Sequence, residues 1–224
     1  HKGGMHTDAM AKNPISYELI NPTRVGNTRH ILMSEVAGGS SVMKLISKIN
    51  PGIAKKSDET RMIMAKLKEM EFEGYQYEAA EASFELIIRK ILGLYKPSFE
   101  LVEFKVMVNE PSINHVNSTA MIKIKVGDQF EITAAEGDGP VDALDGALRR
   151  SLMKFYPNLE KIKLTDYKVR VLDSELATAA KVRVLIESTD GKSEWTTIGV
   201  STDIIEASWL ALVDSIEYCL CQEG

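Results

Sequence analysis

The chain has 224 residues, of which 44% are hydrophobic and 26% are charged, and its formal net charge is −5 at pH 7. This composition is typical of an ordinary protein with a hydrophobic core and one or two domains, and it excludes the disordered and fibrous classes. The acidic balance disfavours a nucleic-acid partner. With neither a long apolar run nor a signal-peptide pattern, we expect no membrane partner and a cytoplasmic location.

The first part of the chain, residues 1–56, begins with short segments that Gly-Gly and Asn-Pro pairs interrupt. It starts at His1 without an initiator Met, so we expect a piece of a longer chain. His1 and His6 do not share one helix face, and no carboxylate or Cys completes a zinc set, so we predict no metal site. A free imidazole is nevertheless a competent proton-transfer group.

Two helices are predicted in the next part, over residues 57–96. The first starts at a Ser57-Asp58 cap and ends at Gly74, and the second runs from about Tyr77 to Leu92 with Gly93 as its stop signal. We interpret this region as a helical linker subdomain.

After residue 97 the hydrophobic period changes to two, as in half-buried strands. Glu103–Val108 resembles Asp166–Val171, and Glu136–Leu144 resembles Val200–Ser208, always in the same order. The pattern predicts an α+β domain over 97–224, built as a duplicated strand-strand-strand-helix unit with dimer-forming strand edges.

The two units cover residues 97–157 and 160–221. Gly127-Asp128 is predicted to form a type II′ hairpin turn in the first unit, and Asp190-Gly191 a turn in the second. Cys219 and Cys221 have no second pair and no neighbouring His, so we expect reduced thiols.

A small-molecule carboxylate could bind where the third strand of each unit turns into its helix, because a helix start offers unpaired N–H groups. Glycines let a ligand approach the first of these turns, and apolar residues of the following helix could form the wall of a pocket. The alternative is that the glycines only make the turn and the apolar residues only fill the core. The candidate ligand-binding residues are Gly137, Asp138, Gly139, Pro140, Leu152, Phe155, Val169, Ser201 and Asp203.

Several long blocks also resemble a known family. His1–His6, Val25–Arg29, Glu73–Glu85, Gly137–Leu144 and Ile205–Tyr218 are similar to the C-terminal half of the citramalate synthases, relatives of 2-isopropylmalate and homocitrate synthases. The resemblance implies an N-terminal TIM barrel, missing here, that uses a divalent metal to condense acetyl-CoA with pyruvate to (R)-citramalate in isoleucine biosynthesis. It implies a homodimer whose residues 97–224 bind isoleucine or leucine for feedback inhibition.

The resemblance also assigns residues 1–56 to packing on the barrel and His6 to a catalytic role, as a polarising or proton-transfer group. We expect the chain alone to lack synthase activity and to hold no cofactor, since the metal site lies in the barrel. The alternatives are the same part of a 2-isopropylmalate synthase in leucine biosynthesis, and a ligand-free dimerisation module. A double-stranded RNA module has a similar element order, but the acidic balance disfavours it.

Overall fold

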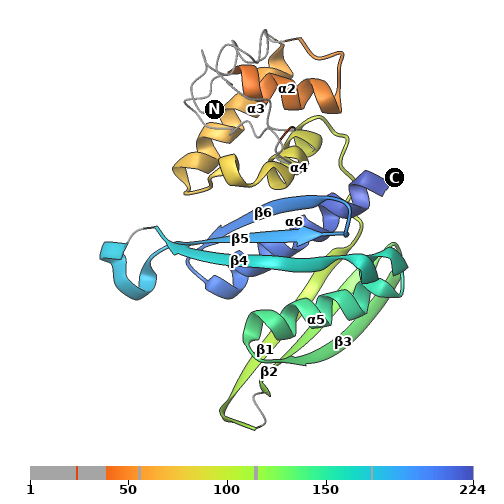
Figure 1. Ribbon diagram of the computed structural model, residues 1–224, viewed down its shortest axis with the longest axis vertical. Helices are drawn as coiled ribbons and strands as arrows, with labels where there is room; N and C mark the ends of the chain where they lie inside the picture. The colour runs from red at the N-terminus through yellow and green to blue at the C-terminus, as the bar shows by residue number, and fades with distance from the viewer. Residues whose placement is uncertain (1–23, 25–38, 55–56, 114–115, 173, 224) are drawn as a thin grey trace. The chain divides into compact units, whose positions relative to one another are not determined.

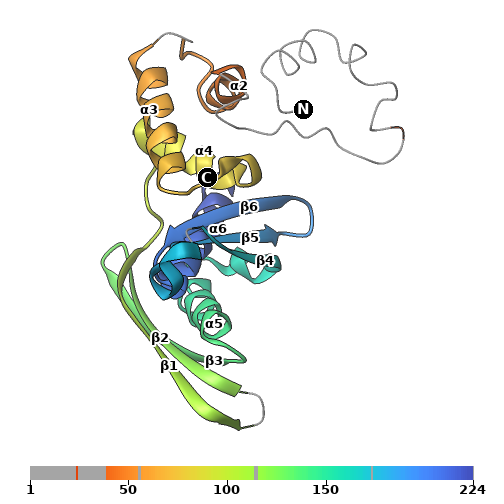
Figure 2. The same ribbon diagram turned by 90° about the vertical axis from the view of Figure 1, so that its left-hand side faces the viewer.

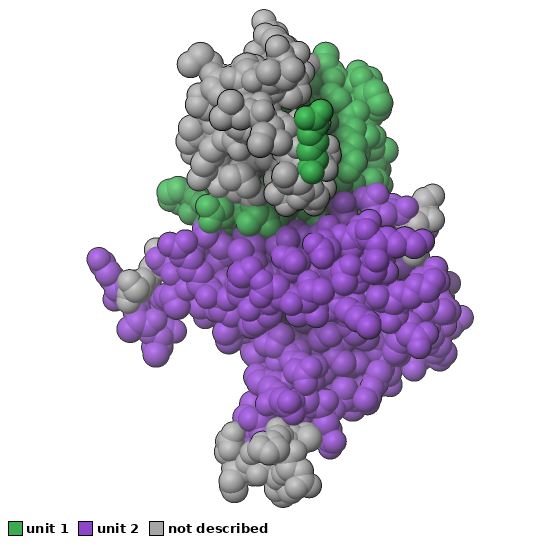
Figure 3. All heavy atoms as spheres, viewed as in Figure 1, with its two compact units in different colours: residues 1–95 green, residues 96–224 purple. Residues whose placement is uncertain are grey.

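The computed structural model describes residue 24 and residues 39–54, 57–113, 116–172 and 174–223. The chain divides into two compact units, residues 1–95 and 96–224 (Figure 3). The boundary between the two units lies between residues 95 and 96. No helix in the described part of the chain is long and apolar enough to cross a membrane.

The described part of the first unit is helical (Figure 1). Its elements are α2 (Gly39–Ile49), α3 (Asp58–Phe72), the 3₁₀ turn η4 (Tyr77–Ala79) and α4 (Glu81–Ile91). Each helix contacts the other two, and Ile46, Ile63 and Phe84 contribute one fully buried side chain from each. The core is small and is shared by all three helices.

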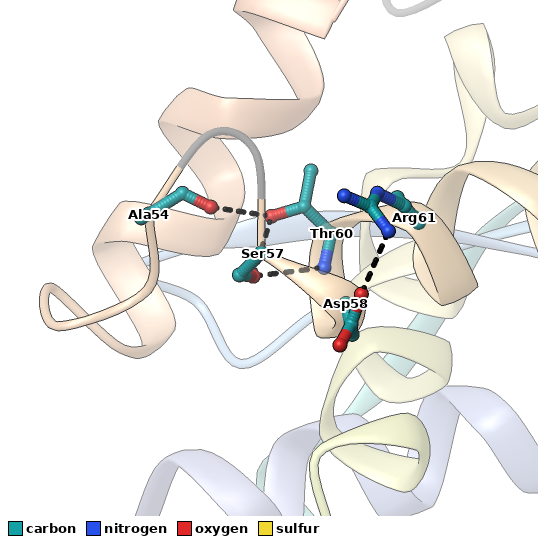
Figure 4. Close-up of polar contacts among 5 residues, drawn as sticks. All are labelled: Ala54, Ser57, Asp58, Thr60 and Arg61. Carbon is teal, nitrogen blue, oxygen red and sulfur yellow. Dashed lines mark hydrogen bonds and ion pairs between the residues drawn. The ribbon is translucent and has the colours of Figure 1, made fainter.

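The start of α3 is fixed by local hydrogen bonds (Figure 4). The Ser57 hydroxyl oxygen accepts from the Thr60 N–H at 3.2 Å, and the Thr60 hydroxyl donates to the Ala54 carbonyl at 3.0 Å. Arg61 pairs with Asp58 at 2.9 Å on the exposed side. The predicted Ser57 cap is confirmed, because its side chain satisfies an N–H that the helix itself leaves unpaired.

The other helices of this unit differ from the prediction in two places. Helix α2 was missed, although Val42, Leu45 and Ile46 have helical spacing and are buried. The second predicted helix starts later than expected, because Tyr77–Ala79 forms a separate 3₁₀ turn before α4. Its predicted stop is confirmed by Gly93, whose φ is +67°.

The second unit contains two three-stranded antiparallel sheets, each followed by a helix (Figures 1 and 2). Sheet A has the order β1 (Glu100–Ile113), β2 (Val116–Val126) and β3 (Gln129–Gly137), followed by α5 (Pro140–Met153). Sheet B has the order β4 (Lys163–Val171), β5 (Val182–Thr189) and β6 (Glu194–Ser201), followed by α6 (Ile204–Glu223). The 3₁₀ turns η5 (Pro157–Lys161) and η6 (Ser174–Ala179) flank β4. The predicted α+β class is confirmed.

The two predicted hairpin turns have different outcomes. Val126 pairs with Gln129, so Gly127-Asp128 is a two-residue loop, and among its residues only Gly127 has positive φ, +58°, as type II′ requires. In sheet B, Thr189 pairs with Glu194, so the loop around Gly191 has four residues instead of two. The Asp190 carboxylate stabilises this longer loop by accepting two backbone N–H groups.

Each helix packs on its own sheet through a similar contact. The Thr133 hydroxyl of β3 donates to the Ala147 carbonyl of α5 at 2.8 Å, and the Thr197 hydroxyl of β6 donates to the Ala211 carbonyl of α6 at 2.8 Å. Leu148 and Ile122 are fully buried between α5 and sheet A. These contacts fix where each helix starts relative to the strand before it.

Near the start of this unit, Ser98 is hydrogen-bonded both to α6 and to the segment that follows α5. The buried Glu217 carboxylate of α6 accepts from the Ser98 N–H at 2.9 Å and from its hydroxyl at 2.9 Å. The Tyr156 hydroxyl, just after α5, donates to the Ser98 carbonyl at 2.7 Å. Burial and the charge of Glu217 together raise the pKa of Tyr156.

Candidate functional site

The candidate site is a hollow where β3 turns into α5. Its volume is about 610 Å³, and it opens to solvent. It is lined by Thr119, Ala134, Ala135, Glu136, Gly137, Asp138, Asp142 and Arg150. β2 contributes Thr119, which is paired with Glu136 of β3, and α5 contributes Asp142 and Arg150. A volume of this size admits a small metabolite.

The turn into α5 is tight at Gly137. A Cβ added there would lie 2.4 Å from the Ala143 nitrogen and 2.7 Å from Asp142 Oδ2. The Asp142 carboxylate also accepts the Asp138 N–H at 3.0 Å. The carboxylate therefore lies at the positive end of the helix dipole and satisfies a loop amide, which leaves that position poorly suited to a second carboxylate.

Charge in the hollow is mixed. Glu136, Asp138 and Asp142 are exposed acidic side chains, and Arg150 is the one basic side chain of the lining. Arg150 is placed by a bond from its guanidinium to the Ala134 carbonyl at 3.2 Å. Because guanidinium groups carry further donors, Arg150 can still bind an anionic group of a ligand. The acidic side chains offer partners for an ammonium group.

The first group of predicted residues lies at this place. Gly137 and Asp138 line the hollow, and Gly139 and Pro140 follow at the N-cap and first position of α5. A Cβ added at Gly139 would have no atom within 4 Å, and its φ of −155° suits any residue, so the close packing of this turn on α5 depends on Gly137. Whether Gly139 lets a ligand approach the helix start stays a prediction.

The predicted apolar wall is not brought to the hollow. Leu152 lies in the last turn of α5 and is fully buried in the core, and Phe155 lies beyond the helix end. A helix rises about 1.5 Å per residue, so these residues are on the order of 20 Å along α5 from its start. Val169 belongs to β4 of the other sheet and is exposed there. None of the three lines the hollow.

Ser201 and Asp203 lie at the start of α6, where their polar groups bind each other and the helix. The Ser201 hydroxyl accepts the Asp203 N–H at 3.0 Å and donates to the Glu206 carboxylate. The Asp203 carboxylate accepts the Ile205 N–H at 2.7 Å. These bonds give both residues a capping role in the folded chain.

The two remaining predictions concern the catalytic role of His6 and the binding of a metal ion. His6, the predicted catalytic residue, lies outside the described residues. Among the residues that the structure describes, no group of three or more His, Cys, Asp or Glu side chains is placed to hold a metal ion.

Sequence reasoning missed most of the lining. Thr119 depends on the register between β2 and β3, which the sequence does not state. Arg150 was not among the predicted site residues, and its neighbour Arg149 binds outside the hollow, to Asp145 at 2.7 Å and to the Ile162 carbonyl at 2.8 Å. Helical spacing could have indicated Arg150, because it follows Asp142 by eight residues and therefore lies near the same side of α5.

Comparisons with known proteins agree with the resemblance drawn from the sequence. Residues 1–74 match the family described as homocitrate synthase post-HMGL domain-like. Over 224 residues the chain is 47% identical to the (R)-citramalate synthase of Aquifex aeolicus, covering all of this chain and 42% of that protein. Over 221 residues it is 46% identical to the (R)-citramalate synthase of Geobacter sulfurreducens, covering 98% of this chain and 42% of that protein.

The chain therefore spans about two fifths of the length of these curated relatives. Residues 78–220, which include both sheets, α5 and most of α6, match the family described as LeuA allosteric (dimerisation) domain. This match covers more than half of the chain. The chain belongs to the LeuA allosteric (dimerisation) domain family.

Proposed function

We propose that this chain is the regulatory part of an acyltransferase that condenses acetyl-CoA with pyruvate to (R)-citramalate in isoleucine biosynthesis. The relatives named (R)-citramalate synthase support this activity for the longer protein. The regulatory role is supported by the family description, which names an allosteric and dimerising domain. The longer protein would act as a homodimer in the cytoplasm.

The observation that carries the regulatory proposal is the mixed charge of the hollow beside Gly137. A branched-chain amino acid is a zwitterion whose ammonium and carboxylate lie on one carbon. Arg150 supplies the partner for its carboxylate, and Glu136 and Asp138 supply partners for its ammonium. The methyl groups of Ala134 and Thr119 provide apolar contact for its side chain.

This arrangement reverses the orientation expected from the sequence. There the ligand carboxylate was placed on the N–H groups of the helix start, but Asp142 already lies there and binds the Asp138 N–H. A ligand carboxylate at that point would face a like charge. The hollow therefore favours a ligand carboxylate at Arg150, which lies eight residues further along α5 than Asp142.

Calorimetric titration of the 224-residue chain tests the proposal. Isoleucine and leucine should both bind, isoleucine more tightly, and 2-methylbutylamine, which lacks the carboxylate, should bind weakly. Arg150→Ala should weaken isoleucine binding about tenfold, the lower end of what a charged hydrogen bond contributes. It should leave the binding of the amine unchanged, because the amine has no group for Arg150.

Lys154→Ala is the matched control, because Lys154 lies one turn further along and pairs with Glu131 outside the hollow. Equal losses from Lys154→Ala and Arg150→Ala would assign the effect to general charge. If neither amino acid binds at millimolar concentration, the ligand-free dimerisation module is the better account. If leucine binds far more tightly than isoleucine, the regulatory part of a 2-isopropylmalate synthase is favoured.

For the longer protein we propose that His6 takes part in catalysis, and that the divalent metal is bound by the barrel and by no residue of this chain. His6→Ala in the full-length enzyme should lower kcat about 10²-fold or more with little change in pyruvate binding, as for a general acid or base. An unchanged kcat would remove His6 from the mechanism. The 224-residue chain alone should release no CoA from acetyl-CoA and pyruvate.

A further inference from the structure

An exposed apolar column lies on strand β4, at the edge of sheet B. Tyr167, Val169 and Val171 alternate along the strand and therefore point to one side of the sheet. That side carries α6, because the Tyr167 hydroxyl shares a 2.8 Å hydrogen bond with Ser208. The three side chains are nevertheless 36%, 42% and 51% exposed, and this exposure rises along the strand away from Ser208.

The neighbouring helices do not cover this column. Helix α6 packs against β5 and β6, where Val184 and Ile186, the partners of Val169 and Tyr167, are fully buried. Helix α5 approaches this strand at its beginning, where Arg149 binds the Ile162 carbonyl just before β4. The far end of the column is left open to solvent.

The first sheet carries a comparable column on β1, where Phe104 is covered within the chain and Val108, at the far end, is 57% exposed. Phe104 of β1 aligns with Tyr167 in the sequence, and the Trp209 ring of α6 packs on it with ring centroids 5.4 Å apart. The residue of α5 that aligns with Trp209 is Asp145, whose carboxylate binds Arg149. The aromatic side chain that covers Phe104 on β1 thus has no counterpart over Tyr167 on β4.

We propose that a second copy of this chain covers the Tyr167-Val169-Val171 column. The inference rests on the proposed homodimer and names the surface that forms it. A column on an edge strand can meet its own copy across a two-fold axis, so one apolar patch supplies both sides of the contact. The matched dimerisation family includes all of β4.

Charge favours this surface over a second exposed apolar surface, which lies on the side of sheet A away from α5. There Ile132 and Phe130 are exposed, but they pair across strands with Lys123 and Lys125. Two copies meeting through that side would bring lysines together, which opposes a self-complementary contact. On β4 the charged residues Asp166, Lys168 and Arg170 alternate to the opposite side of the strand from the column.

Sedimentation equilibrium of the 224-residue chain tests this surface. Val169→Lys and Val171→Asp each place a charge in the proposed contact and should weaken dimerisation at least 100-fold, with an unchanged circular dichroism spectrum. The control Ile132→Lys makes a similar change at an exposed position of sheet A and should leave the dimer intact.

The outcomes separate the inference from the proposal on which it rests. A wild-type chain that remains monomeric at millimolar concentration contradicts the homodimer itself. A wild-type dimer that survives both β4 variants, or that only Ile132→Lys disrupts, overturns the β4 surface and leaves the homodimer standing. If Val169→Lys fails to fold, Val171→Asp decides, because Val171 is half exposed at the open end of the column.

Discussion

The two halves of the second unit have the same plan but start their helices differently. Both join a three-stranded sheet to a helix, and both use a threonine hydroxyl to bind a helix carbonyl. Helix α6 starts with a side-chain cap from Asp203, whereas α5 starts at Gly139 and Pro140 with no side-chain cap. Only the start of α5 lines the hollow assigned to a ligand.

Glycine also serves the two halves at different points of the third strand. Gly137, the last residue of β3, lets the strand end approach the first turn of α5 at Ala143, whereas Gly199, inside β6, approaches the first turn of α6 at Ala207. A Cβ at Gly199 would lie 1.9 Å from the Ala207 carbonyl oxygen. The comparison teaches that close packing in the second half serves stability, while in the first half it also shapes the hollow in which we propose that a ligand binds.

Gly199→Ala should produce the largest effect, because the added methyl group collides with helix backbone that cannot rotate away. We expect a loss of about 3 kcal/mol in the free energy of unfolding, at the upper end for overpacking. Urea denaturation measures it. Gly139→Ala adds the same group in open space and changes only the N-cap preference, so it should cost less than about 1 kcal/mol. Equal losses from the two variants would contradict the comparison.

Glu217→Ala should have the next largest effect. It removes the buried carboxylate that binds the Ser98 N–H and hydroxyl, and an unsatisfied buried donor costs about 1–3 kcal/mol. The control is Glu206→Ala, since Glu206 is exposed and binds only the Ser201 hydroxyl among the bonds described here. A smaller loss for Glu217 than for Glu206 in thermal denaturation would show that the anchor at Ser98 is unimportant.

The two helix starts can be compared directly by changing their caps. Asp203→Ala should cost about 1 kcal/mol, the usual effect of losing an N-cap side chain. Gly139→Ser should instead gain a few tenths of a kcal/mol, because α5 has no side-chain cap to lose. Chemical denaturation of both variants checks this, and a stabilising Asp203→Ala would reverse the assignment.

The smallest expected effect depends on pH. Burial and the charge of Glu217 raise the pKa of Tyr156 above its usual value, so its protonated form favours the folded chain. Its contribution is fully present below the unfolded pKa of about 10 and is lost as pH rises through the folded pKa. We expect the wild type to lose more stability than Tyr156→Phe when the pH rises from about 9 to about 11, which is one pH unit on each side of the unfolded tyrosine pKa. Parallel pH profiles would contradict this.

Local chemistry explains why much of the fold was predictable. Ser57, Gly93 and Gly127 act on residues within one turn of themselves, so their sequence neighbours suffice to predict a cap, a stop and a turn. The strands were recognisable because one side of each sheet is buried, which imposes an alternating pattern. Helix α2 and the four-residue loop after Thr189 show where a short pattern or a plausible Asp-Gly pair misleads.

The site was less predictable because it depends on register and direction. Leu152 has the right chemistry for a pocket wall, but the helix carries it away from Gly137 and into the core. Thr119 is 18 residues from Gly137 in sequence and reaches the same hollow only through strand pairing. The positions of residues along one helix can be counted from the sequence, whereas contacts between strands can be known only once the strand pairing is known.

The central claim is that the hollow beside Gly137 binds a branched-chain amino acid. The most direct measurement is a two-dimensional ¹⁵N–¹H NMR titration of the chain with isoleucine. The amide signals of Thr119, Gly137 and Asp138 should shift together and saturate, while those of Ser201 and Asp203 at the start of α6 should stay in place. Shifts confined to the start of α6, or no shifts at millimolar isoleucine, would contradict the claim.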